Sequence, residues 1–76
     1  MIFIFAGSYG EAKHCALNMN LPPRTWKYIW GSESIRGILK GKIIFWGSYG
    51  FRNDYFLIRD KINYLIEVGR LEEMKI

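Results

Sequence analysis

Three short apolar runs, each followed by the dipeptide Gly-Ser, divide this chain. Ile2–Phe5 and Lys42–Trp46 are almost continuously apolar, whereas Trp26–Trp30 alternates aromatic residues with others. Short continuous apolar runs indicate strands that are buried on both faces, as in a parallel sheet. Aromatic alternation also favours a strand. The chain is therefore predicted to contain three strands.

Helical signals follow each run. Glu11–Met19 is rich in helix formers, and Ser8 offers an N-cap with Glu11 three positions later. A short helical turn is predicted over Ile35–Leu39, and the longest helix over residues 54–68. This alternation predicts a small α/β sandwich of two or three layers, with a three-stranded parallel sheet and right-handed crossovers. The favoured strand order is 2-1-3, which is half-Rossmann-like.

Length and composition limit how such a domain is stabilised. The chain has 76 residues, which is enough for one domain over residues 1–76, with residues 70–76 either a tail or an added strand. One cysteine and one histidine permit neither an intrachain disulfide nor a Cys/His zinc cage. With three Trp, five Tyr and five Phe, the chain is expected to form a homo-oligomer whose subunit number is left open.

Charge and hydropathy argue against two classes of partner. The net charge of +4 is spread over the chain without a basic run, which supports only weak binding of nucleic acid. The longest apolar run, Met1–Ala6, is too short for a membrane span or a signal peptide. The expected location is therefore the cytoplasm, without a membrane partner.

The loops after the runs are the main candidate site. Gly7-Ser8-Tyr9-Gly10 recurs as Gly47-Ser48-Tyr49-Gly50, and Gly31-Ser32 follows the second run. In a parallel sheet of order 2-1-3, the two matched loops would lie side by side at the switch point, where glycine backbone and helix N-termini can bind a phosphate. Arg52 and Arg36 could add guanidinium contacts. The candidate ligand-binding residues are Gly7, Ser8, Tyr9, Gly10, Gly31, Ser32, Arg36, Gly47, Ser48, Tyr49 and Arg52.

Each feature also has a structural interpretation. Gly-Ser is common turn and N-cap chemistry, Arg52 could be a solvated loop residue, and Glu11 and Asp54 could serve as helix caps. The full Gly-x-Gly-x-x-Gly fingerprint and the P-loop are absent. His14 and Cys15 are neighbours on the predicted helix and point apart, so no catalytic pair is expected. We predict no catalytic residue, metal or cofactor, with Cys15 in the core and His14 partly solvated.

Several short motifs resemble a family of small phage-encoded α/β proteins of uncharacterised function. They are Phe5–Gly7, Trp26–Trp30, Ile35–Gly37, and the strand ending at Gly47 with Arg52 and Asp54 beyond it. The likeness spans about residues 2 to 66 and implies a phage or prophage origin and a half-Rossmann-like fold, but no established activity. By analogy, it implies an anti-defence protein in the host cytoplasm that sequesters a nucleotide immune signal.

Three binding functions remain open from the sequence, and an enzyme whose site is shared across a subunit interface is a further, less favoured alternative. The first is non-catalytic binding of a nucleotide or other phosphate-bearing ligand at the Gly-Ser loops. The second is inhibition or adaptation of a host protein through exposed aromatic residues, and the third is weak binding of nucleic acid.

Overall fold

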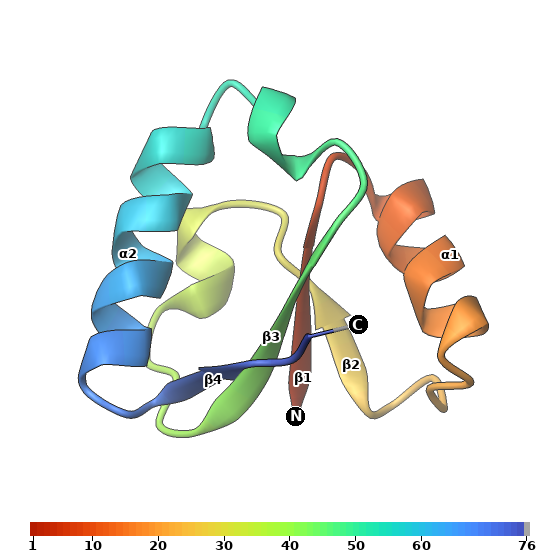
Figure 1. Cartoon of the computed structure of the whole chain (residues 1–76), viewed down its shortest axis with the longest axis horizontal. Coiled ribbons are helices and arrows are strands. Elements are labelled where there is room, and N and C mark those ends of the chain that lie inside the picture. The colour runs from red at the N-terminus through yellow and green to blue at the C-terminus, as the bar shows by residue number, and fades with distance from the viewer. Residues whose placement is uncertain (76) are drawn as a thin grey trace.

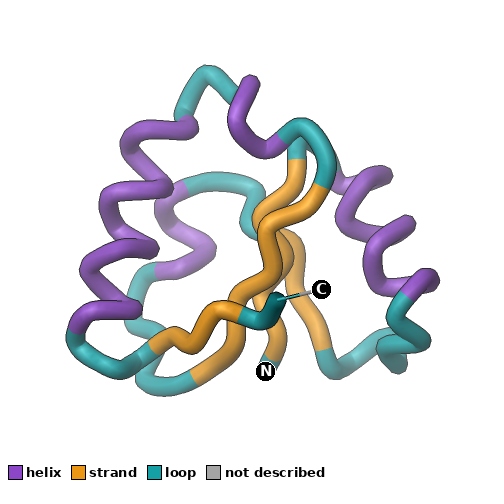
Figure 2. The backbone as a smooth tube through the Cα atoms, in the orientation of Figure 1, coloured by secondary structure: helices purple, strands orange, loops and turns teal. Residues whose placement is uncertain are grey.

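Helices cover both faces of one parallel sheet in the computed structural model, which describes residues 1–75 (Figure 1). Figure 2 shows the sheet edge-on between the two longer helices. In chain order the elements are β1 (Ile2–Ala6), α1 (Tyr9–Asn18), β2 (Trp26–Tyr28), the 3-10 turn η1 (Ser32–Ile35), β3 (Gly41–Trp46), the 3-10 turn η2 (Tyr49–Phe51), α2 (Tyr55–Glu67) and β4 (Leu71–Glu73).

The sheet has four strands in the order β2-β1-β3-β4, and every neighbouring pair is parallel. The predicted order 2-1-3 is confirmed, but the prediction of three strands is wrong. Gly69, at φ +82°, turns the chain after α2, and Leu71 then buries its side chain beside β3. Of the predicted tail over residues 70–76, Leu71–Glu73 is thus an added strand, and Ile76 lies outside the described residues.

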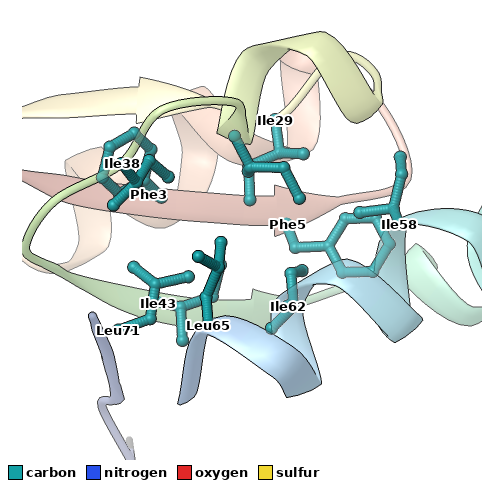
Figure 3. Packing of buried hydrophobic residues seen from close by; sticks show 10 residues of the cluster. Phe3, Phe5, Ile29, Ile38, Ile43, Ile58, Ile62, Leu65 and Leu71 are labelled. Carbon is teal, nitrogen blue, oxygen red and sulfur yellow. The ribbon is translucent and has the colours of Figure 1, made fainter. Parts of the chain in front are cut away.

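Successive residues of β1 and β3 build two separate cores, because side chains alternate between the faces of a strand. Phe3, Phe5 and Ile43 pack with residues of α2 and η1, as Figure 3 shows. Ile4 and Ile44 point to the other face, where α1 contributes a set of small buried residues, Ala12, Cys15 and Ala16. The domain therefore has three layers, which was one of the two predicted alternatives.

Helix boundaries follow the predicted caps in part. α1 begins at Tyr9, and the Ser8 hydroxyl accepts a hydrogen bond from Glu11 N–H at 3.2 Å, as predicted. The turn predicted over Ile35–Leu39 lies earlier, at Ser32–Ile35, because the backbone becomes extended at Arg36 and Gly37 then adopts φ +78°. Asp54 precedes α2, but its carboxylate makes no cap hydrogen bond and instead binds Arg52.

Apolar residues remain on the outer surface of α2 and its approach. Those most exposed there are Phe51, Phe56, Leu57, Tyr64 and Val68. Such a surface is typical of an interface, so self-association stays a prediction, which sedimentation analysis would test. Within residues 1–75, no helix combines the length and the apolar character needed to cross a bilayer.

Candidate functional site

The loops that follow β1 and β3 meet at the carboxyl edge of the sheet (Figure 1). β1 and β3 are neighbours in parallel register, yet the chain leaves β1 for α1 on one face and β3 for α2 on the other. This is a topological switch point, the place where open parallel sheets bind ligands. We call residues 7–10 and 47–50 together the loop pair. The two loops lie side by side, as predicted.

The carboxylate of Glu11 lies inside the loop pair and joins its two halves. Its Oε1 accepts from Gly7 N–H at 2.8 Å and from Ser48 N–H at 3.0 Å. The Ser48 hydroxyl reaches both carboxylate oxygens, at 3.1 Å to Oε1 and 2.9 Å to Oε2. Donors from two loops therefore converge on one anionic group that belongs to the protein itself. Of these donors, Ser48 is 37 residues away from Glu11 in the sequence.

Two glycines make room for this carboxylate. A Cβ atom on Gly7 would lie 2.1 Å from the Ser48 hydroxyl oxygen and 2.7 Å from Glu11 Oε1. One on Gly47, whose φ is +63°, would lie 2.5 Å from the same Oε1. Contacts this short are excluded for real Cβ atoms, so glycine at both positions is what permits the close approach. The repeated Gly-Ser therefore has a spatial reason beyond turn geometry.

Hydrogen bonding at this position favours the charged form of Glu11. The Ser48 backbone N–H, the Gly7 backbone N–H and the Ser48 hydroxyl together lower the pKa of Glu11 below its ordinary value of 4.5. A carboxylate whose pKa is depressed on folding stabilises the fold above its unfolded pKa, and this stabilisation is lost as pH falls through the folded value.

Glu11→Gln should therefore lower the free energy of unfolding at pH 7, and this loss should shrink as pH falls below about 4.5. Urea titrations of both proteins between pH 7 and pH 3 would measure the difference. Glu67→Gln is the matched control, because Glu67 is exposed at the end of α2 and its carboxylate makes no hydrogen bond or ion pair with any residue from 1 to 75. A constant difference across this pH range would show that the Glu11 charge does not stabilise the loop pair.

Arg52, a predicted phosphate ligand, is used within the fold. Its side chain is only 9% exposed and forms an ion pair with Asp54 at 2.9 Å. The guanidinium also donates to the carbonyl oxygens of Ala6, Ile29 and Trp30, at 3.1, 2.5 and 2.8 Å. With a second bond to Asp54, all five of its N–H donors are engaged. Arg52 thus ties the carboxyl ends of β1 and β2 to the start of α2 and is not a solvated loop residue.

The two tyrosines of the loop pair have different environments. Tyr9 is 57% exposed and stacks on Trp26 with ring centroids 6.1 Å apart. Tyr49 is partly buried against Phe5 and Phe45, with centroid distances of 5.6 and 5.3 Å. Only Tyr9 therefore has a ring accessible for stacking on a ligand.

The third Gly-Ser loop does not join the loop pair. Ser32 and Arg36 line a separate hollow of about 720 Å³ between η1 and α2. Arg36 forms a 3.2 Å ion pair with Glu33, and its side chain is 79% exposed. The eleven candidate residues are thus divided. The loop pair contains Gly7, Ser8, Tyr9, Gly10, Gly47, Ser48 and Tyr49, whereas Gly31, Ser32 and Arg36 lie elsewhere and Arg52 binds within the fold.

Sequence reasoning missed the role of Glu11, which it interpreted as a helix cap. No local signal reveals this contact, because the partner loop is distant in sequence and its position depends on the pairing of β1 with β3.

The remaining candidates occupy ordinary positions. Cys15 is fully buried, as predicted, and burial raises the pKa of its thiol. His14 is exposed on α1, with its ring edge-on to Trp46. Within residues 1–75, no group of three or more His, Cys, Asp or Glu side chains could hold a metal ion.

No protein-family model, curated protein sequence or solved structure matches this chain. The site is therefore interpreted from its own geometry, and the resemblance to small phage proteins stays a prediction.

Proposed function

We propose that this chain binds a phosphate-bearing ligand, such as a nucleotide, at the loop pair without converting it. The observation that supports the proposal is the convergence of Gly7 N–H, Ser48 N–H and the Ser48 hydroxyl on one anionic group. Backbone N–H groups beside glycines bind phosphate oxygens in the same manner.

Glu11 is the internal competitor of that ligand. Its carboxylate already accepts from these donors, and its negative charge repels a phosphate placed beside it. A ligand must therefore displace the Glu11 side chain from the loop pair. We infer that the wild-type protein binds its ligand more weakly than a variant that lacks this carboxylate.

Recognition would depend on hydrogen bonds and on one aromatic ring. Arg52 has no N–H donor left for a phosphate, so the backbone, the serine hydroxyls and the N-terminus of α1 carry the anion contacts. The exposed ring of Tyr9 is available to stack on a base. This arrangement favours a phosphate joined to an aromatic group over inorganic phosphate alone.

Thermal unfolding against mono-, di- and cyclic nucleotides tests the proposal. At about 100 times its dissociation constant a ligand adds about 2.7 kcal/mol, which moves the midpoint of so small a domain by about 10 °C or more. The midpoint of Glu11→Ala should rise at lower ligand concentrations than that of wild type, and the midpoint of Ser48→Ala only at higher concentrations. Chromatography of the same samples should return the nucleotide intact.

Glu67→Ala is the control for Glu11→Ala, because it removes the same charge far from the loop pair along the chain. Circular dichroism first establishes that the Glu11→Ala variant is folded. If no nucleotide then changes its midpoint of thermal unfolding, the proposal is wrong. The loops would then be turns whose amides serve only to bind Glu11.

A further inference from the structure

β2 forms one edge of the sheet, with β1 on its inner side (Figure 1). Ile2 N–H donates to Thr25 O at 3.0 Å, and Ile29 N–H donates to Ile4 O at 2.9 Å. Backbone groups alternate in direction along a strand, so those of Trp26 and Tyr28 point away from β1. Among residues 1–75, no strand pairs with this outer side. The edge therefore offers free backbone donors and acceptors.

An aromatic groove runs beside this edge. It measures about 450 Å³ and is lined by Tyr9, Pro23, Trp26, Lys27, Tyr28 and Trp30. Tyr9 packs on both Trp26 and Tyr28, with ring centroids 6.1 and 5.9 Å away. Trp30 is 62% exposed, although its carbonyl is fixed by Arg52. We call this surface the β2 groove. Three of its rings, those of Tyr9, Trp26 and Tyr28, therefore pack against one another.

The charge of the β2 groove has one sign. Lys27 lines it, and Arg24 lies in the sequence between Pro23, which also lines it, and β2; both Lys27 and Arg24 are exposed. The sequence has no aspartate or glutamate between Glu11 and Glu33, a span that contains all of β2 and its approach. A complementary partner therefore carries negative charge.

We propose that the β2 groove binds an extended, acidic polypeptide segment as an added strand. The free backbone groups of Trp26 and Tyr28 supply main-chain pairing, and alternate side chains of the segment lie over the aromatic rings. Acidic side chains of the segment pair with Lys27 and Arg24. This inference shares Tyr9 with the loop pair but does not rest on Glu11 or on the ligand proposed there.

A second copy of this chain fits the edge less well. Two β2 strands related by a two-fold axis would bring Lys27 and Arg24 of both copies together, with no carboxylate in that segment to compensate. Single-stranded nucleic acid would satisfy the rings and the charge, but not the backbone groups of Trp26 and Tyr28. An acidic polypeptide satisfies all three.

Model peptides test the proposal by fluorescence anisotropy on the full chain. A fluorescein-labelled (Glu-Val)4 peptide should bind at least about tenfold more tightly than (Lys-Val)4. Methylation of alternate backbone nitrogens in (Glu-Val)4 should weaken binding by about tenfold, because it removes strand donors without changing charge. Binding should also weaken as salt is raised.

Two pairs of variants locate the site. Trp30→Ala should weaken binding of (Glu-Val)4, whereas Phe51→Ala should not, although the Phe51 residue in η2 is more exposed, at 90%. Arg24→Glu with Lys27→Glu should abolish the preference for the acidic peptide, whereas Lys61→Glu with Arg70→Glu should preserve it.

Three results would overturn the proposal. One is the absence of (Glu-Val)4 binding at millimolar concentration, and another is tighter binding of oligothymidylate than of the peptide. The third is sedimentation as a dimer that Trp30→Ala dissociates, which would assign the edge to a second copy.

Discussion

Replacing Arg52 with alanine should lower the free energy of unfolding by about 3 kcal/mol or more. The side chain is 9% exposed, and its removal leaves the carbonyl oxygens of Ala6, Ile29 and Trp30 without their donor. Asp54 also loses its cationic partner. Hydrogen bonds to a charged group contribute about 1.5–3 kcal/mol each, but they share one side chain and do not add.

Arg36→Ala is the matched control for this prediction. Arg36 is 79% exposed and pairs only with Glu33 among residues 1–75, so its removal should change stability by less than about 0.5 kcal/mol. Arg52→Lys should lie close to Arg52→Ala, because an ammonium cannot reproduce the planar fork. Urea titrations measure the free energy of unfolding of all three variants. A variant that is unfolded in water can be measured in the presence of a stabilising osmolyte. Equal small effects for Arg52 and Arg36 would contradict this role.

Phe5→Ala should be at least as damaging, with a loss of about 3–5 kcal/mol. Phe5 is fully buried at the carboxyl end of β1, with its ring against Phe45, Tyr49 and Tyr55. The Arg52 guanidinium lies 5.2 Å from its ring centroid. Removing this ring leaves a cavity and loosens the contacts that hold Arg52.

Phe51→Ala deletes the same ring at a site that is 90% exposed and should change stability by no more than about 0.5 kcal/mol. Phe5→Leu keeps most of the buried volume and should give a smaller loss than Phe5→Ala. The free energies of unfolding come from the same urea titrations. If the Phe5 and Phe51 variants were equally stable, the core assigned to this end of the sheet would be wrong.

The edge strand β2 could be predicted from its alternating aromatic residues, and the two central strands because their side chains are buried on both faces. Ile2–Phe5 and Lys42–Trp46 signal this by continuous apolar sequence, and their pairing in the centre of the sheet follows from it. β4 has the sequence Leu-Glu-Glu and only one buried residue, Leu71, so it lacks that signal. Edge strands depend on their neighbours, and sequence alone left this segment open.

The site was predictable in position but not in chemistry. Identical Gly-Ser-Tyr-Gly loops after strands that pair in parallel had to meet, and they do. That Glu11 would fill the space between them depends on the Gly7 and Gly47 backbones, which only the assembled sheet brings together. Arg52 was interpreted as a ligand contact because nothing in its local sequence reveals the carbonyls of β1 and β2.

We propose that the loop pair binds anions and that Glu11 fills it in the absence of ligand. The most direct measurement is ¹⁵N–¹H NMR of Glu11→Ala titrated with pyrophosphate, which observes the amides of Gly7 and Ser48 themselves. We expect saturable shifts of these two amide resonances, at lower pyrophosphate concentration than in wild type, while the resonances of Lys27 and Tyr28 do not shift. The proposal is wrong if the amide resonances of Gly7 and Ser48 do not shift at the highest pyrophosphate concentration. It is also wrong if only the resonances of Arg24 and Lys27 shift.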